Sequence, residues 1–287
     1  MNPLRRLQIF LDTIKFEHSI FALPFAVVAA FMVAGGWPNW VQFGWVIVAM
    51  VTLRTFAMAA NRLVDAEIDR RNPRTADRAL AKGVIGKPEV IVYMAVSAVA
   101  FVVAAWQLDP LALILSPIPI VVAFAYPYLK RFTWLAHFGI GAVYVIVPPA
   151  VAIAMTGTMP VEFVLLGVAA LFWVSGFDVL YAIADIEFDR ASGLHSIPAY
   201  FGIKRSLVIA KALHIVTLLF LALSVLTAEG GLWAAFGIVA VGILFAYEHS
   251  LVKENDLSKL NMAFFTMNGI IAVVFAVFIV LDELLIG

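Results

Sequence analysis

The sequence contains no cysteine, so disulfide bonds and thiolate metal sites are excluded. Charged residues are also scarce: they make up 13% of the 287 residues, and the 19 basic and 19 acidic side chains cancel to a formal net charge of zero. We expect no nucleic-acid partner. The N-terminal stretch MNPLRRLQIFLDTIKFEHS lacks a clear small-residue cleavage site. The first apolar run is therefore predicted to be a permanent membrane span rather than a removed signal.

Apolar residues make up 64% of the chain and gather in long runs. This pattern is typical of integral membrane proteins of the all-α, multi-span class. A span needs about 20 apolar residues at a rise of about 1.5 Å each. The sequence therefore predicts one membrane domain, 1–287, with nine transmembrane helices. Their ranges are about 17–35, 41–62, 88–106, 110–129, 134–155, 161–186, 205–227, 231–250 and 261–284.

Lysine and arginine are distributed unevenly between the two sides of these spans. With a cytoplasmic N-terminus, the inner segments carry the basic residues and the outer loops have none. Cytoplasmic loops of membrane proteins are enriched in these residues. We therefore predict an inner- or plasma-membrane protein with a cytoplasmic N-terminus and, after nine spans, a C-terminus on the outer side.

Two clusters of oxygen-bearing side chains lie where an apolar run meets a basic loop. The first cluster, in NRLVDAEID, follows the second span, and the second cluster, in DVLYAIADIEFD, follows the sixth. Residues four apart share a helix face, so each cluster is predicted to form a polar stripe. Carboxylates at the edge of the hydrocarbon need a cation, and Mg²⁺ prefers carboxylate and phosphate oxygens. We predict that two Mg²⁺ ions and a diphosphate are held by Asn61, Asp65 and Asp69 of the first cluster and by Asp178, Asp185 and Asp189 of the second.

Basic and aromatic side chains near the clusters favour an anionic ligand. The loop RRNPRTADRALAKGVIGK follows the first cluster, and the guanidinium groups of Arg74 and Arg78 suit phosphate oxygens. In YPYLKR, Lys130 is a further candidate for binding the diphosphate, and Tyr126 for stabilising a cation or holding a substrate. Tyr181, within the second cluster, is predicted to act similarly.

Arg54 lies inside the second predicted span, about two turns before the first cluster. A buried arginine needs an acidic partner or an anionic ligand. We predict that Arg54 pairs with a cluster carboxylate or binds the carboxylate of a small substrate. The five histidines show no metal-ligand spacing, and lone histidines are more often structural than ligating.

The chain also contains a weak internal repeat. The interval from Asp65 to Asp185 nearly equals the interval between the tyrosines of FAYPYLKR and FAYEHSLVK. Two pairs of similar motifs separated by nearly the same number of residues indicate a duplication. They predict two four-helix halves, about 17–129 and 134–250, followed by a ninth helix at about 261–284. The halves would face each other across a central cavity, with one cluster on each wall.

The residues alone leave three interpretations open. The clusters could bind a metal–diphosphate, form an ion or proton pathway in a transporter, or be acidic helix ends without a site. The last fits less well, because acidic residues oppose the dipole at a helix C-terminus. A phosphatidyltransferase-type enzyme also uses carboxylates and Mg²⁺, but its DG…AR…G…D…D pattern is not found.

Taken together, these motifs resemble the UbiA family of intramembrane prenyltransferases. NRLVDAEID is similar to the family's first NxxxDxxxD motif, and DVLYAIADIEFD to its second aspartate-rich motif. NPRTADRAL, YPYLKR and GLHSIPAYFG resemble its loop signatures, although His195 stands where a lysine is common. The resemblance runs from EHSIFALPF to DLSKLNMAFFTMNG.

The resemblance implies nine helices around a cavity that opens laterally to membrane lipid. It also implies Mg²⁺-dependent transfer of a prenyl group from an allylic diphosphate to a small aromatic acceptor. Asn61, Asp65, Asp178 and Asp185 would hold metal and diphosphate, with Asp69 and Asp189 completing the clusters. Arg74, Arg78 and Lys130 would bind phosphate oxygens, and Arg54 and Tyr126 would lie near the reacting carbon or the acceptor. The flanking segments favour 4-hydroxybenzoate as the acceptor, in quinone biosynthesis, with the dihydroxynaphthoate of menaquinone synthesis as the alternative.

Overall fold

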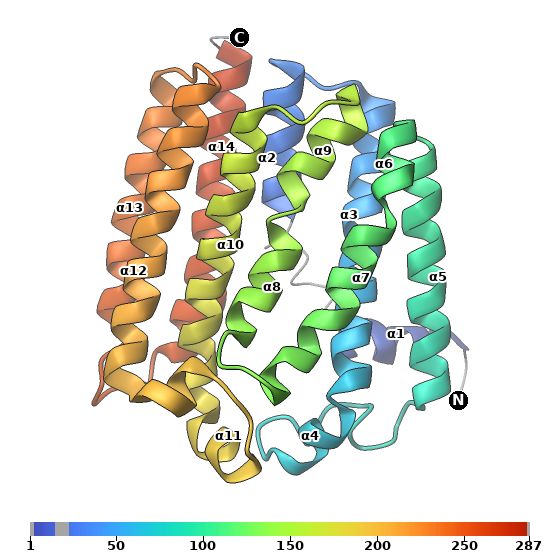
Figure 1. The fold of residues 1–287 in the computed structure, drawn as a ribbon, viewed down its shortest axis with the longest axis vertical. Helices are drawn as coiled ribbons and strands as arrows, with labels where there is room; N and C mark the ends of the chain where they lie inside the picture. The colour runs from blue at the N-terminus through green and yellow to red at the C-terminus, as the bar shows by residue number, and fades with distance from the viewer. Residues whose placement is uncertain (1–2, 15–22, 286–287) are drawn as a thin grey trace.

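The computed structural model describes residues 3–14 and 23–285, and within those ranges it is almost entirely helical and has no β-strand. The long helices run roughly parallel to the long axis and form a bundle (Figure 1). The first half contains α1 (Pro3–Thr13), α2 (Leu23–Ala34), α3 (Trp40–Val64), α4 (Ala66–Arg71), α5 (Lys87–Trp106), α6 (Pro110–Leu115), α7 (Pro117–Ala125) and the 3₁₀ helix η2 (Tyr126–Arg131). The second half contains α8 (Ala136–Tyr144), α9 (Val147–Thr156), α10 (Val161–Ala182), the 3₁₀ turn η3 (Ile183–Asp185), α11 (Ile186–Ser192), α12 (Ile197–Thr227), α13 (Leu232–Leu251), the π-helix η4 (Met262–Met267) and α14 (Asn268–Leu285).

Eight helical stretches of the described residues are long and apolar enough to cross a membrane. They correspond to the second to ninth spans expected from the sequence. The first expected span, 17–35, begins outside the described ranges, and its remainder forms α2, whose 12 residues are fewer than a span needs. The all-α, multi-span architecture is confirmed, and the count of nine stays a prediction.

Two of the expected spans are each made of two shorter helices. α6 and α7 meet at Ser116, just before Pro117, and α9 begins with Pro148 and Pro149 in its first turn. Proline lacks an amide hydrogen, and its ring clashes with the preceding turn, so a continuous helix breaks there. Proline therefore breaks the helix within the fourth and fifth expected spans, 110–129 and 134–155, although both stretches are long and apolar enough to cross a membrane.

The helices that carry the two clusters also break, each at the central aspartate. Asp65 (φ −91°, ψ 3°) separates α3 from α4, and Asp185 (φ −107°, ψ 6°) lies at the junction of η3 and α11. The amide of Asp65 still donates to the Asn61 carbonyl at 3.0 Å, and the amide of Asp69 donates to the Asp65 carbonyl at 2.7 Å. The polar stripe expected on an unbroken helix therefore survives the break. The two similar breaks agree with the expected repeat, which itself stays a prediction.

The centre of the bundle is α10, which packs against α8, α9 and α12 (Figure 1). Its Trp173 meets Phe25 of α2 and Phe245 of α13 edge to face, with ring centroids 5.2 and 5.3 Å away. Close packing against α12 depends on glycine, because a Cβ added at Gly176 would lie 2.4 Å from the ring of His214. Small residues let membrane helices approach closely, so the second cluster is carried on a tightly held helix.

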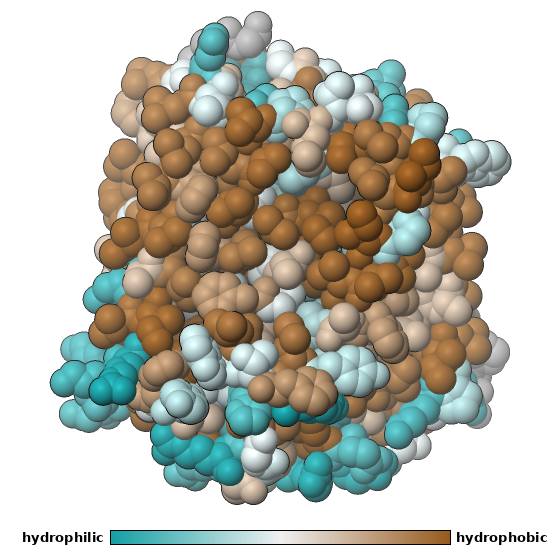
Figure 2. Space-filling model, viewed as in Figure 1, coloured by the Kyte–Doolittle hydropathy of each residue, from teal (hydrophilic) through white to brown (hydrophobic). Residues whose placement is uncertain are grey.

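The outer surface is apolar along the middle of the bundle and polar at the end that carries α4 and α11 (Figure 2). Exposed valines such as Val92, Val96 and Val99 cover the outer face of α5. Trp40 begins α3 and Trp106 ends α5, so both lie at the opposite end, where an aromatic belt is typical of membrane proteins. Both features are those of an integral membrane protein.

Candidate active site

A cavity of about 970 Å³ lies among α3, α4, α8, α10 and α11, at the polar end of the bundle. Every residue for which the sequence suggested a role in the site lines this cavity. They are Arg54, Asn61, Asp65, Asp69, Arg74, Arg78, Tyr126, Lys130, Asp178, Tyr181, Asp185 and Asp189. The two clusters therefore face one common space.

Asp65 is the most enclosed carboxylate of the first cluster, with 3% of its side chain exposed. Lys130 of η2 donates to it from Nζ at 2.6 Å, and Arg131 contacts it at 3.3 Å. The Asn61 amide donates to the same carboxylate at 3.2 Å. Two cations and an amide thus offset the desolvation of a carboxylate that would be costly alone.

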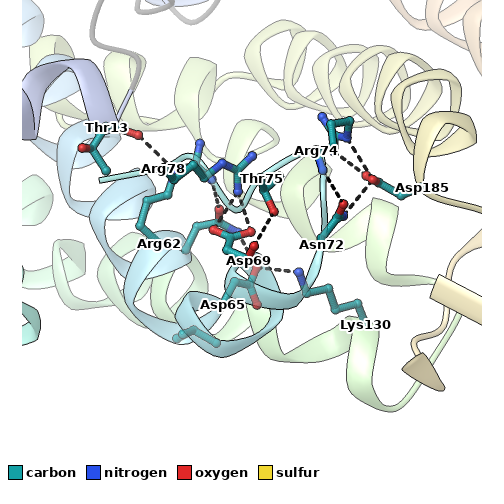
Figure 3. A network of polar contacts seen from close by, with 12 residues as sticks. Thr13, Arg62, Asp65, Asp69, Asn72, Arg74, Thr75, Arg78, Lys130 and Asp185 are labelled. Atoms are coloured by element: carbon teal, nitrogen blue, oxygen red, sulfur yellow. Dashed lines mark hydrogen bonds and ion pairs between the residues drawn. The ribbon is translucent and has the colours of Figure 1, made fainter. Parts of the chain in front are cut away.

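Asp69, one turn further along, accepts two hydrogen bonds from Nη1 of Arg78, at 2.7 and 2.8 Å. Arg78 belongs to the loop after α4, and Thr75 ties that loop back by donating to the Asp69 carbonyl at 3.1 Å. The loop therefore folds over the first cluster instead of extending into solvent. This folding explains how the basic residues reach the cavity (Figure 3).

The same loop joins the first cluster to the second. Arg74 forms an ion pair with Asp185 in which Nε lies 2.9 Å from Oδ1 and Nη2 contacts Oδ2. Asn72 donates to Oδ1 of Asp185 at 2.9 Å (Figure 3). Burial lowers the pKa of Arg74, but hydrogen bonds with Asp185 and Tyr181 more than offset it, so that pKa is raised above its usual value. Arg74 is a permanent cation between the two walls.

The other two carboxylates of the second cluster contact side chains outside the basic loop. Asp178 lies 2.7 Å from Nδ1 of His137 on α8, and Asp189 accepts from the Ser196 hydroxyl at 2.7 Å. Both partners come from elements other than the helices that carry the aspartates. The second cluster is therefore oriented by the surrounding fold as well as by its own helix.

An aromatic surface adjoins the Arg74–Asp185 pair. The guanidinium of Arg74 lies 4.5 Å from the centroid of the Tyr181 ring, and Phe264 of the π-helix η4 stacks on that ring at 4.0 Å. Rings so placed can stabilise a positive charge in the cavity. Tyr126, at the start of η2, and Arg54, deeper along α3, line the same space.

The sequence and the structure of the chain both match those of a known protein family. Residues 22–270, most of the chain, match the UbiA prenyltransferase family. The chain belongs to that family.

The apo structure of a UbiA homolog from Aeropyrum pernix K1 is 31% identical, with a TM-score of 0.85 over 94% of this chain and 99% of that one. A 4-hydroxybenzoate octaprenyltransferase from Aliivibrio fischeri (strain MJ11) is 29% identical over 247 residues, which are 86% of each chain. A UbiA homolog from Archaeoglobus fulgidus bound to GPP and Mg²⁺ shares the fold, with a TM-score of 0.70 at 19% identity, over 95% of this chain and 99% of that one.

Family membership confirms the resemblance found in the sequence and decides among the interpretations that were left open there. This UbiA-family protein is an enzyme that transfers prenyl groups, not a transporter. The first-cluster aspartates bond to Lys130, Arg131 and Arg78, and Arg54 lines the same cavity from α3. The role of Arg54 stays a prediction.

Several residues of the UbiA-family site were missed by sequence reasoning. Arg62 and Arg131 were used only as basic residues of the inner segments, to predict the orientation in the membrane. In the structure, Arg62 donates to the Asn61 side chain at 2.9 Å and to the Thr13 carbonyl at 3.0 Å. Asn72 could have been found, because it stands at the start of the NPRTAD signature. His137 had no sequence signal, since its only link to Asp178 is spatial.

Proposed function

We propose that this enzyme transfers a (poly)prenyl group from an allylic diphosphate to an aromatic acid such as 4-hydroxybenzoate, in quinone biosynthesis. The observation that carries the proposal is the joining of the two clusters over one cavity by Asn72 and Arg74. A diphosphate headgroup suits such a site, because it can contact both acidic walls through cations. The Aliivibrio fischeri relative named for 4-hydroxybenzoate supports the acceptor.

Magnesium fits the donor set of this cavity. The clusters offer carboxylate and amide oxygens, the hard donors that Mg²⁺ prefers. Among residues 3–14 and 23–285, no three histidine, aspartate or glutamate side chains are close enough to hold a metal by themselves. We therefore propose that two Mg²⁺ ions bind to the first and second clusters together with diphosphate oxygens, where they would draw electron density from the leaving group. The Archaeoglobus fulgidus homolog bound to GPP and Mg²⁺ supports the use of Mg²⁺.

The basic residues would exchange partners when the donor binds. Lys130, Arg78 and Arg74 neutralise cluster carboxylates in this structure. With a metal–diphosphate in the cavity, the carboxylates would turn to the metal and the basic groups to phosphate oxygens. Their charges would then stabilise the negative charge that develops on the diphosphate as it leaves.

The isoprenoid tail would lie in apolar surroundings. A second cavity of about 320 Å³ shares Met50, Leu53 and Val147 with the main cavity. Its other lining residues are almost all aliphatic, including alanines of α5, α6 and α9. Burial of a hydrocarbon tail there is favourable by about 25 cal/mol per Å² of apolar surface. We propose that membrane lipid contacts the apolar outer face of the bundle and lets such a substrate enter.

The transfer itself is an electrophilic aromatic substitution. The allylic C–O bond breaks, and the diphosphate leaves with the electron pair. The acceptor ring, made electron-rich by its hydroxyl, then forms a C–C bond at the carbon ortho to that group. The ring proton passes to a cluster carboxylate or to the departing diphosphate. Water must be kept away from the allylic cation, which it would otherwise convert into an alcohol, and the aliphatic second cavity would contribute to this exclusion on the side away from the clusters.

Arg54 is proposed to bind the carboxylate of the acceptor. It lies about two turns deeper in α3 than the diphosphate-binding cluster, where the reacting carbon would be. A hydrogen bond to a charged group contributes about 1.5–3 kcal/mol. We therefore expect Arg54→Leu to raise KM for 4-hydroxybenzoate by about 10- to 100-fold while KM for the prenyl diphosphate changes little. Steady-state kinetics with each substrate varied in turn measures both, and an equal rise of the two constants would contradict the assignment.

The function is tested by mass spectrometry of products from the purified protein in detergent. We expect geranyl diphosphate, 4-hydroxybenzoate and Mg²⁺ to yield a C-prenylated acid and diphosphate. A parallel reaction with dihydroxynaphthoate tests the menaquinone-type acceptor. Prenylation of dihydroxynaphthoate alone would overturn the proposed acceptor and retain the chemistry, whereas no product from any acceptor of this class would overturn both.

We further propose that the site faces the cytoplasm. The helices α4 and α11, which carry parts of the two clusters, lie at one end of the bundle, and α14 ends at the other (Figure 1). The end with α4 and α11 also carries the basic loops that the positive-inside rule assigns to the cytoplasm. Mg²⁺ and diphosphate esters would then be supplied from that side.

A further inference from the structure

We propose that His137 is a positioning residue, which holds the carboxylate of Asp178 in the orientation in which it binds metal. The inference rests on the proposed function, because Asp178 is a metal ligand only in that reaction. It adds to that function a residue on α8 that belongs to neither cluster. His137 would act through its contacts with other residues, without touching the substrate.

His137 is enclosed between the second cluster and the start of α12. Only 5% of its side chain is exposed, against 28% for Asp178. Its Nδ1 lies 2.7 Å from Oδ2 of Asp178, and its Nε2 lies 3.2 Å from the backbone nitrogen of Ile197. Both ring nitrogens therefore have a partner, on opposite sides of the ring.

The contact with Ile197 decides which nitrogen carries the hydrogen. A backbone N–H can only donate, so Nε2 of His137 must accept and has no hydrogen of its own. The ring hydrogen is then on Nδ1, from which it is donated to Asp178. Turning the ring over would break both bonds at once. The backbone at Ile197 thus sets the direction of the hydrogen bond to Asp178.

The segment that fixes His137 also fixes two other parts of the site. The amide of His195 donates to the Lys130 carbonyl at 2.7 Å, and the hydroxyl of Ser196 donates to Asp189 at 2.7 Å. Ser196 also accepts from the Ala199 amide at 3.2 Å and so caps α12. Residues 195–197 therefore hold η2, α11 and, through His137, α10 in one arrangement.

Loss of the histidine donor would leave a partly exposed carboxylate free to rotate. Partners that hydrogen-bond to metal ligands orient them, and their removal typically costs about 10- to 100-fold in metal affinity. The helix α10 is packed closely against α12 at Gly176, so the backbone of Asp178 stays in place when the side chain of His137 changes. The expected effect is therefore on carboxylate orientation and metal binding.

Three substitutions separate the two hydrogen bonds of His137. His137→Asn places an amide nitrogen where Nδ1 stood and keeps the bond to Asp178. His137→Gln reaches the position of Nε2 and keeps only the bond from Ile197. His137→Phe fills similar space and keeps neither. His249→Asn is the matched control, because His249 bonds to another histidine at 3.0 Å and is not part of the cavity lining.

The test is Mn²⁺ binding to the purified protein in detergent with the unreactive donor analogue geranyl thiolodiphosphate, followed by the EPR signal of free Mn²⁺. We expect the dissociation constant to rise about 10- to 100-fold in His137→Phe and His137→Gln, and to stay within about 3-fold of wild type in His137→Asn and in the control. Thermal unfolding of each protein is measured in parallel.

Two results would overturn the proposal. One is wild-type Mn²⁺ affinity in His137→Phe and His137→Gln, even with lowered unfolding temperatures, since that is the outcome of a packing role only. The other is an equal loss of affinity in His137→Asn and His137→Phe. Failure of the proposed acceptor is distinguishable, because Mn²⁺ and the donor analogue bind without an aromatic acid.

Discussion

Replacement of Asp185 with alanine is expected to abolish prenyl transfer, with a fall in kcat of at least about 1,000-fold. Asp185 is the carboxylate at which the two walls meet, since it accepts from both Asn72 and Arg74. Its removal deletes a proposed metal ligand and releases Arg74 from its place. Asp65→Ala is expected to have a similar effect, because Asp65 is the enclosed carboxylate that Lys130 of η2 neutralises. Product formation with saturating geranyl diphosphate and 4-hydroxybenzoate measures both.

Neighbouring glutamates provide matched controls for these substitutions. Glu187 follows Asp185 by two residues and Glu67 follows Asp65 by two, but both side chains are exposed and face away from the cavity. Glu187→Ala is expected to retain nearly full activity. Each protein must first elute as a single species in detergent, so that loss of activity is separated from loss of folding. A fully active Asp185→Ala protein that is correctly folded would overturn the assignment of the second cluster.

Removal of divalent metal is expected to stop the reaction almost completely. The cavity presents carboxylates that form ion pairs with basic side chains. A donor diphosphate brought in without metal would compete with those carboxylates for the same lysine and arginine groups. Its leaving group would then lack the charge stabilisation that a hard cation supplies. We expect EDTA to lower turnover at least about 1,000-fold and added Mg²⁺ to restore it.

The control for metal removal is binding of the acceptor. Arg54 lies about two turns from the first cluster along α3, and no metal is needed for a guanidinium group to bind a carboxylate. Binding of 4-hydroxybenzoate, measured by equilibrium dialysis, should therefore change less than 3-fold when EDTA is added. Unchanged turnover after exhaustive chelation would contradict the metal-assisted mechanism directly.

Much of the site could be predicted because many of its residues are near neighbours in the sequence. The two clusters have carboxylates at helical spacing, and the basic loop follows the first cluster directly along the chain. All the residues selected in this way line one cavity. The aspartates could be read as a site because charge at the membrane edge needs a partner. Their partners, however, could be named only in part.

The helix breaks were less predictable. Apolar periodicity extends past Ser116 and past Pro148, so a membrane span looks continuous there, although proline interrupts the backbone hydrogen bonds. Likewise, the start of α12 at Ile197 lies ahead of the apolar run that begins near 205, with Gly202 at φ 79° between them. Caps and kinks depend on local backbone geometry, which hydropathy does not report.

The all-helical membrane architecture, the composition of the two clusters and the family could all be predicted from the sequence alone. These follow from apolar run length and from motifs in which the relevant residues are near neighbours. The contacts between groups around the cavity became visible only in the folded chain: Asn72 and Arg74 with Asp185, Lys130 with Asp65, and His137 with Asp178. Such contacts join residues far apart in the chain, and their pairing depends on how α3, α8 and α10 pack, which no local pattern encodes.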